Sequence, residues 1–452
     1  MHTFVQPAAV ATTESDSVRR ASAFFCRLLP EPRAFDLRFW NGTVAPGTPG
    51  SGLTVVINSP GSLRRMFRPP IDLSLGEAYL RGDFDLEGDV WRAGPALATS
   101  RGALVSPREV LSLAKLWLDL PKDSDRKDHD GDGRYGSRPA KLKAAQNSRD
   151  WDREGIRYHY DAGNDFFAIF LDEQMVYSCA YYRTPDDTLE EAQERKLEHI
   201  CRKLRLKEGE SFLDIGCGWG ALMIHAVSRY GVRALGVTLS EQQHDLAKRR
   251  IADAGLQDRA EVRLMDYREV DATGFDKIAS VGMFEHVGRK RLPEYFDHVY
   301  RILRPGGLFL NHAIAGRPRG STWMRAAIRS ALEPILIGST NFRKRYVFPS
   351  GGLVPVSETN LVAQRSGFEV RDVENLREHY MLTLREWSRR LDARREDAIR
   401  FGGERMYRLW RVYMGVASGQ FERGEFDLSQ SLLLRPASRP SGLPLTREDL
   451  YR

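Results

Sequence analysis

The sequence predicts an α/β protein in which a parallel sheet with helices packed on it follows a smaller α+β domain. Three observations support this prediction. The chain has 452 residues, enough for roughly two or three domains. A polar stretch between Lys122 and Asp150 divides it. Beyond Trp151, short apolar runs alternate with amphipathic ones, which is typical of repeated βαβ units.

The composition is that of a globular protein. Hydrophobic residues make up 42% and charged residues 29%, which allows a core and excludes the disordered class. The net charge of +7 permits contact with a phosphate-bearing surface but is weak evidence for one. The four cysteines are too scattered for a disulfide scaffold and lack C-x-x-C spacing, which indicates a reducing, cytoplasmic compartment.

Membrane-spanning and leader segments are not expected. Residues 1–25 lack the basic region and continuous apolar region of a secretory signal. No apolar run approaches the roughly 18 residues that a membrane span needs. Any contact with a membrane is therefore expected to be peripheral.

The smaller domain is predicted to cover residues 1–120. It begins with a helix at Val18–Leu29, followed by strand-like runs at Phe35–Val44 and Leu53–Ile57. Asn41-Gly42 lies within the first run and is a hairpin signal. These elements together predict a small α+β domain.

Residues 121–150 are predicted to be a polar linker, and residues 151–452 the larger domain. Asp128–Gly133 within the linker fits the first half of a calcium loop, D-x-D-x-D-G. The twelfth position, which needs a bidentate Glu, is Pro139. We therefore expect no metal site.

The strands of the larger domain are short apolar runs. Amphipathic stretches at Ala221–Tyr230 and Ser240–Ala254 separate the first three and are expected to be helices. Parallel strands joined by helices place a ligand site at their carboxyl ends. The predicted strands are Phe212–Ile215, Ala234–Val237, Glu261–Leu264, Lys277–Val281 and Leu308–Asn311, with Phe426–Leu434 returning late to the sheet.

The sharpest local pattern is LDIGCGWG at Leu213–Gly220. Its glycines, Gly216, Gly218 and Gly220, allow a tight turn and the close approach of a ligand. Such turns serve NAD, FAD and S-adenosylmethionine alike, and a plain tight turn is the alternative without a ligand. The turn by itself therefore does not identify a cofactor.

Two further details favour S-adenosylmethionine. The first strand ends in an acid, Asp214, just before the glycines. The second strand ends in Thr238-Leu239, where a dinucleotide enzyme usually carries the acid that binds ribose. A nicotinamide-dependent dehydrogenase is therefore disfavoured.

Two candidate catalytic side chains follow neighbouring strands. Glu285 comes after the fourth strand in VGMFEHVG, and His312 comes after the fifth in FLNHAIA. Taken singly, each residue type is more often a bystander, but both are expected at the carboxyl edge of the sheet. Cys217 is interpreted as a packed residue, and the aromatic segment Tyr177–Tyr182 as core or as a pocket wall.

Several segments, in order, resemble the cyclopropane-fatty-acyl-phospholipid synthase family, which includes the mycolic acid cyclopropane synthases. LSLGEAYLRGDFDLEGDV (Leu73–Val90) also resembles the N-terminal domain of the full-length bacterial synthases. The resemblance implies a Rossmann-like class I methyltransferase domain. The segments of that domain are YHYDAGNDFF (158–167), MVYSCAYY (175–182), FLDIGCGWG (212–220), GVTLSEQQ (236–243), SVGMFEHVG (280–288) and NHAI (311–314).

The resemblance also implies a reaction. In the family, S-adenosylmethionine donates a methyl group to the cis double bond of an acyl chain, and the cation loses a proton as the ring closes. A bicarbonate ion accepts that proton, and its site maps to Cys179, Glu285, His312, Ile314 and Tyr380, with Cys179 and Ile314 contributing backbone groups. The cofactor site maps to Tyr177, Ser178, Gly216, Gly218, Gly220, Thr238, Gln243 and Asp266, with Asp214 and Leu239 beside them.

Such a reaction needs a pocket that excludes water and offers ring faces to a cation. Phe166, Phe167, Tyr177, Tyr181 and Tyr182 are the candidates for its walls. Many family members carry a late-helix cysteine where this chain has Ala417, which excludes covalent thiol catalysis there.

The segment 324–335 has apolar residues at helical spacing, and Arg325 and Arg329 on its other face. It is expected either to lie on anionic lipid or to cover the acyl pocket.

We therefore expect a cyclopropane-fatty-acyl-phospholipid synthase acting on unsaturated phospholipid acyl chains at the membrane surface. The chain is expected to be cytoplasmic and peripherally membrane-associated, without a nucleic-acid partner, and a homodimer is an open alternative. A methyltransferase of the same scaffold that leaves a methyl or methylene branch is a second reading. A non-catalytic lipid-binding protein is a third.

Overall fold

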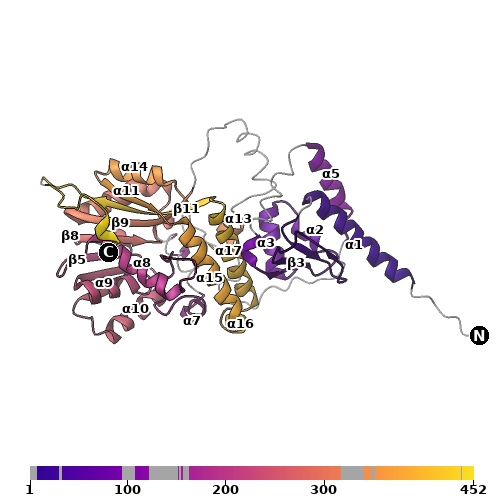
Figure 1. The fold of residues 1–452 in the computed structure, drawn as a ribbon, viewed down its shortest axis with the longest axis horizontal. Coiled ribbons are helices and arrows are strands. Elements are labelled where there is room, and N and C mark those ends of the chain that lie inside the picture. The colour runs from indigo at the N-terminus through magenta and orange to yellow at the C-terminus, as the bar shows by residue number, and fades with distance from the viewer. Residues whose placement is uncertain are drawn as a thin grey trace, which may run out of the picture. The chain divides into compact units, whose positions relative to one another are not determined.

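The structure is a computed structural model and describes residues 8–29, 33–93, 107–121, 151, 154–155, 162–316, 341–347, 352–438 and 440–451. Residues 122–150, with the half calcium loop, and the segment 324–335 lie outside the described residues. The chain divides into two compact units (Figure 1). The smaller unit comprises Met1–Ser137, Gly320–Val347 and Gly403–Gln420, and the larger unit comprises Arg138–Arg319, Phe348–Gly402 and Phe421–Arg452.

A small mixed sheet organises the smaller unit, in the order β2-β1-β3-β4. β1 and β2 form an antiparallel hairpin around Asn41-Gly42, which confirms the predicted turn, and Gly42 takes the positive φ of +85° that it needs. β1 then pairs in parallel with β3, and β3 pairs antiparallel with β4. The strands are β1 Asp36–Arg38, β2 Val44–Ala45, β3 Leu53–Ile57 and β4 Phe84–Gly88.

Helices from both ends of the chain complete the smaller unit. The Tyr346 hydroxyl donates to Glu77 at 3.0 Å, and Arg411 donates to the Leu86 carbonyl at 2.9 Å. These contacts bring in late segments that the predicted boundaries at 120 and 150 do not include. The helices are α1 Ala8–Leu28, α2 Ser62–Met66, α3 Ile71–Arg81, η1 Val90–Arg92, α5 Pro107–Leu118, α13 Asn341–Tyr346 and most of α17 Glu404–Glu422.

The described part of the larger unit contains a seven-stranded sheet in the order β10-β11-β9-β8-β5-β6-β7. The strands from β9 to β7 are parallel, as predicted, whereas β11 and β10 are added antiparallel. The strands are β5 Ser211–Ile215, β6 Arg233–Thr238, β7 Ala260–Leu264, β8 Phe275–Val281, β9 Leu303–Gly316, β10 Glu369–Asn375 and β11 Phe426–Leu434.

Helices cover both faces of this sheet. Figure 1 shows α8, α9 and α10 on one face, and α11 and α14 on the other, in agreement with two separate apolar core clusters. The predicted helices at 221–230 and 240–254 are confirmed as α9 and α10. The helices are α7 Asn164–Phe167, α8 Leu189–Leu204, α9 Ala221–Tyr230, α10 Glu241–Asp253, α11 Leu292–Ile302, α14 Val356–Arg365, α15 Arg377–Ala393 and α16 Arg395–Gly402, with short turns η2 Tyr267–Glu269, η3 Phe284–His286, η4 Arg289–Arg291 and η5 Glu448–Leu450.

Two strands differ from the prediction. β10 was not expected from the sequence because its residues, EVRDVEN, are mostly polar. β9 is longer than predicted, so His312 lies within this strand instead of after it. The extension has a physical cause, because β11 pairs antiparallel with β9 as far as Gly316.

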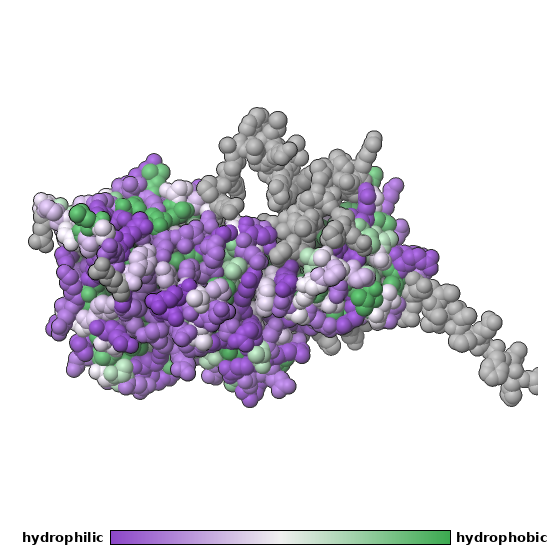
Figure 2. Space-filling model, viewed as in Figure 1, coloured by the Kyte–Doolittle hydropathy of each residue, from purple (hydrophilic) through white to green (hydrophobic). Residues whose placement is uncertain are grey.

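No helix among the described residues is long and apolar enough to cross a membrane. On the face that Figure 2 shows, hydrophilic residues predominate and apolar residues occur in small groups.

Candidate active site

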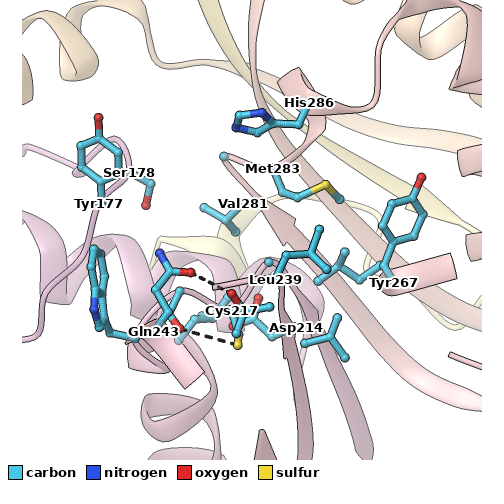
Figure 3. A pocket seen from close by; sticks show the side chains of 18 of the residues that line it. Tyr177, Ser178, Asp214, Cys217, Leu239, Gln243, Tyr267, Val281, Met283 and His286 are labelled. Carbon is cyan, nitrogen blue, oxygen red and sulfur yellow. Dashed lines mark hydrogen bonds between the residues drawn. The ribbon is translucent and has the colours of Figure 1, made fainter. Parts of the chain in front are cut away.

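A pocket opens at the carboxyl ends of β5, β6, β7 and β8 in the larger unit. Its wall combines the turns after these strands with the segment 175–178 and one face of α8. Figure 3 shows Tyr177 and Ser178 on one side of this pocket and Tyr267 on the other. The position agrees with the expectation for an open parallel sheet.

The glycine-rich turn after β5 forms the floor of the pocket. The backbone N–H groups of Gly216 and Cys217 both donate to the Val237 carbonyl, at 2.9 and 3.1 Å, which fixes the turn against β6. Gly218 has φ +55°, and a Cβ placed on it would meet nothing within 4 Å. A ligand can therefore approach the backbone at Gly218 closely.

Gly220 has a different role from the one predicted. It does not belong to the residues that line the pocket but precedes the first residue of α9, with φ +86°. A Cβ there would meet the Ala247 Cβ at 3.2 Å, so the missing side chain lets α9 approach α10. The structure therefore places Gly220 in helix packing.

The turn after β6 carries a buried polar pair. The Thr238 hydroxyl donates to Gln243 Oε1 at 2.8 Å, and both residues line the pocket together with Leu239. Ser240 caps α10 by accepting from the Gln243 N–H at 3.4 Å. This cap turns the first helical residues, including Gln243, back toward the pocket.

Asp266 and Tyr267 line the pocket after β7. The Asp266 carboxylate accepts from the Arg268 side chain at 2.5 and 2.8 Å and from the Arg268 N–H at 2.9 Å. Asp266 is 2% exposed. These bonds hold a buried carboxylate in place at this end of the pocket.

The opposite end of the pocket is formed by Tyr177 and Ser178. The Tyr177 ring stacks on Trp387 with centroids 5.1 Å apart. The Ser178 carbonyl accepts from the Gln193 side chain of α8 at 2.9 Å, and the Ser178 hydroxyl accepts from Lys196 Nζ at 2.9 Å. Helix α8 thus fixes the segment that contains Tyr177 and Ser178.

The pocket wall contains two buried side chains of opposite charge, Asp214 and Lys196. Asp214, at the end of β5, is 2% exposed, and burial raises its pKa to about 7 against the opposing effect of Lys196. Lys196 is also 2% exposed, and burial lowers its pKa to about 8 although Asp172 and Asp214 counteract the shift. The sequence analysis did not identify Lys196, and its helical position in a charged stretch gave no signal for it.

The predicted catalytic residues form a second, deeper group. Glu285 Oε1 accepts from the Ile314 N–H at 2.7 Å, and His312 Nδ1 lies 3.1 Å from Gln430 Nε2. Among the described residues, Glu285 Oε2 and His312 Nε2 are buried without a hydrogen-bond partner. Burial raises the pKa of Glu285 and lowers that of His312 well below its usual value.

Register places Glu285 and His312 at the same level of the sheet. Val281 at the end of β8 is the partner of His312 in β9, so Glu285 follows β8 at the level of His312. Cys179 is fully buried, and its thiol donates to the Ala180 carbonyl at 3.2 Å. Tyr380 lies on α15, where its ring packs against Phe421 at 4.9 Å.

The aromatic residues are arranged differently from the prediction. Tyr177 lines the pocket, but Phe166 and Phe167 are fully buried behind it. Tyr181 is sandwiched between His199 and His379, with centroids 4.3 and 4.8 Å away. These ring contacts and the hydrogen bond that the Tyr181 hydroxyl donates to Glu374 at 3.1 Å hold Tyr181 outside the pocket lining.

His286 is a second pocket residue that the sequence analysis missed. It directly follows Glu285 in the 3-10 turn η3 and is 9% exposed. Burial lowers its pKa to about 4, so its ring is neutral near pH 7. Its position next to the candidate Glu285 could have identified His286 from the sequence.

The residues present fit S-adenosylmethionine. The open space at Gly218 admits a ligand against the backbone, and the Thr238–Gln243 pair offers hydrogen bonds in the pocket wall. Asp214 and Lys196 supply both signs of charge, which suits a molecule with cationic and anionic groups. Among the described residues, Glu285 Oε2 and His312 Nε2 are each buried without a partner, so each could take a proton or a polar ligand atom.

Comparison with known proteins identifies the family of this chain. The model of the family "Mycolic acid cyclopropane synthetase" matches residues 147–431. A probable fatty acid methyltransferase from Pseudomonas putida is 36% identical over 418 residues, covering 92% of this chain and 96% of that protein. Tuberculostearic acid methyltransferase UfaA1 from Mycobacterium tuberculosis is 32% identical, covering 88% of this chain and 87% of that one.

Solved structures show the same relationship. The crystal structure of mycolic acid cyclopropane synthase CmaA1 complexed with SAH and CTAB is similar with a TM-score of 0.55 and 32% identity. The similarity covers 62% of this chain and 97% of that one. The chain therefore belongs to the mycolic acid cyclopropane synthetase family of S-adenosylmethionine-dependent methyltransferases.

Proposed function

We propose that this enzyme methylates the cis double bond of an unsaturated acyl chain in a phospholipid and closes a cyclopropane ring. The observation that carries the proposal is that Glu285 Oε2 and His312 Nε2 are both buried and, within the described part of the chain, without a partner, in the unit that holds the charged, glycine-floored pocket. Methyl transfer needs the cofactor pocket, and the proton loss that follows needs groups such as Glu285 and His312 to accept or hold the proton.

S-adenosylmethionine, when bound, supplies an electrophilic methyl group. Gly216 and Gly218 would face it with backbone, and Thr238, Gln243 and Asp266 would bind and orient it. Tyr177, stacked on Trp387, presents an aromatic wall that excludes water and stabilises positive charge. Orienting a weak alkene nucleophile is itself a large contribution to rate.

Glu285, His312 and Tyr380 would then handle the proton that the substrate cation releases. Because His312 is neutral, it donates to or accepts from an oxyanion without adding charge. A bicarbonate ion bound there would share a proton with Glu285, since two bare anions repel. The backbone of Cys179 would complete this proposed anion site, whereas the Ile314 N–H acts indirectly, because it already donates to Glu285 Oε1. Ala417 offers no thiol, so the mechanism is non-covalent.

A second candidate product is a methyl or methylene branch on the acyl chain. The specific support is that two relatives covering 92% and 88% of this chain are named probable fatty acid methyltransferase and tuberculostearic acid methyltransferase. Both products require methyl transfer and proton loss, so the same residues serve either. They differ in how the cation is resolved: loss of a methyl proton with ring closure gives the cyclopropane, and a 1,2-hydride shift before that loss gives the methylene branch. A saturated methyl branch would further need a hydride donor.

Expression in a host with unsaturated phospholipids tests the proposal. Mass spectrometry of the extracted lipids is expected to show acyl chains heavier by one CH2. The added carbon is expected to come from the methyl group of S-adenosylmethionine. NMR then separates ring CH2 protons from those of a methylene branch. Unmodified lipids from cells that contain folded enzyme would refute acyl methylation, and olefinic methylene signals would support the second candidate.

A further inference from the structure

Lys196 is a buried cation in the pocket wall. It projects from α8 and its Nζ donates to the Ser178 hydroxyl at 2.9 Å. An ammonium group has three N–H donors. No other hydrogen bond or ion pair of Nζ is found among the residues that the structure describes, so donors remain for a ligand.

The nearby carboxylates do not use up this charge. Asp172 accepts from the backbone N–H groups of Val176 and Gln174, at 2.8 and 3.1 Å, and is occupied with shaping the loop before Tyr177. Asp214 lines the pocket beside Lys196, yet within the described part of the chain the two make no ion-pair contact. Asp214 and Lys196 therefore both line the pocket without being paired to each other.

Separate charges of opposite sign match a zwitterion. The amino-acid end of S-adenosylmethionine carries an ammonium and a carboxylate on one carbon, so it needs an anion and a cation side by side. Lys196, which donates to Ser178, and Asp214, which Figure 3 shows beside Cys217, provide them in one pocket wall. At the Tyr267 end, Arg268 is held by Asp266.

We propose that Lys196 binds the α-carboxylate of S-adenosylmethionine and holds the Ser178 hydroxyl toward the same group, while Asp214 faces the ammonium. The proposal rests on the proposed function, because it requires the pocket to bind this cofactor. It assigns a cofactor-binding residue outside the glycine turn, on the helix that precedes β5.

Two ligands that differ only in the carboxylate test the proposal by calorimetry. Wild-type enzyme is expected to bind S-adenosylmethionine at least about tenfold more tightly than decarboxylated S-adenosylmethionine, since a charge-assisted bond is lost. Lys196→Met removes the charge with similar volume. This variant is expected to lower the affinity for S-adenosylmethionine by about tenfold and the affinity for the decarboxylated ligand by less than about threefold.

Lys203→Met is the matched control. Lys203 lies on the same helix, is equally buried, and is ion-paired to Glu374 and Asp372 away from the pocket wall. Its variant is expected to keep the wild-type preference between the ligands. Arg291→Gln tests the rival cation in the wall. Far-UV circular dichroism of each variant checks that it folds.

Several outcomes would overturn the proposal. Equal wild-type affinity for the two ligands would do so without any variant. An equal loss for both ligands in Lys196→Met would make Lys196 a packing residue, and loss of the preference in Arg291→Gln alone would assign the carboxylate to Arg291. Wild-type enzyme that binds neither ligand would instead refute the cofactor pocket, and with it the proposed function.

Discussion

At the scale of single residues, burial sets the chemistry of the site. Glu285 and His312 are both nearly inaccessible, and each is shifted toward its neutral form, so that the pKa of Glu285 rises and that of His312 falls. Among the residues that the structure describes, one of the two Glu285 carboxylate oxygens has a partner, the Ile314 N–H, and the other has none. The other is left for a proton or an anion that the reaction brings.

Glu285→Gln is expected to lower kcat by about 100-fold or more while changing cofactor affinity by less than about threefold. Glu285 does not line the cofactor pocket, so its substitution is expected to slow a step after cofactor binding. Tyr380→Phe is expected to act in the same direction. Steady-state kinetics and calorimetry on the same preparations measure both effects.

The same variant has a pH signature. If charged Glu285 is needed, the wild-type rate falls as pH drops through the pKa of Glu285, which burial raises above 4.5. Glu285→Gln is expected to lose this limb. Glu358→Gln, on an exposed ion pair with Arg289, is the control and keeps it. Full activity in Glu285→Gln would remove the residue from the mechanism, and lost cofactor binding would move it into the cofactor site.

At the scale of secondary-structure elements, β9 organises the deeper group. It pairs in parallel with β8 and antiparallel with β11, so that Val281, His312 and Gln430 stand in one row across three strands. The Gln430 amide then lies 3.1 Å from His312 Nδ1. Strand β11, from the far end of the chain, thus fixes the ring of a candidate catalytic residue.

The turn between β5 and α9 makes its own prediction. Gly218→Val is expected to weaken S-adenosylmethionine binding more than about tenfold, because the side chain would enter the open space that the ligand needs. Calorimetry on the folded variant measures the change.

Gly255→Val is a control with the same backbone cost. Gly255 has φ +66°, close to the +55° of Gly218, and a Cβ there also meets nothing within 4 Å. A non-glycine residue in this conformation costs about 1–2 kcal/mol at either site. Only Gly218 lines the pocket, so similar affinities in the two variants would show that the turn does not contact the cofactor.

At the scale of the whole molecule, the two compact units share the chain unevenly. α13 and most of α17 belong to the smaller unit, although strands and helices of the larger unit flank them in sequence. Ala417 lies on α17 and is 8% exposed, so the position that carries a cysteine in many family members is a packed alanine of the smaller unit.

The proposed phospholipid substrate requires contact with a bilayer, and the excess of basic residues predicts how that contact depends on charge. Lys and Arg number 68 against 61 Asp and Glu. We expect vesicle binding to strengthen with the fraction of anionic lipid and to weaken with salt, since each basic residue near such a surface contributes about 1 kcal/mol that is screened. Co-sedimentation at two salt concentrations measures this, with neutral vesicles as the control. Salt-independent binding to both kinds of vesicle would contradict it.

The sequence by itself determined the α/β class, the parallel strands β5 to β9, the late strand β11 and the glycine turn. These features are local, since apolar periodicity and glycine spacing act within a few residues. It also placed Asp214, Thr238 and Leu239 at strand ends, and the family resemblance added Gln243 and Asp266. The structure gathers all five around one pocket.

Tertiary structure decided the rest. Whether a buried lysine such as Lys196 faces a pocket depends on how α8 packs against the segment 176–178, which no local pattern encodes. The polar strand β10 exists because β11 pairs with it, and His312 lies inside β9 for the same reason. The late helices joined the smaller unit through contacts such as Arg411 with Leu86, 325 residues apart in sequence. Such long-range contacts depend on packing and pairing that only the folded chain supplies.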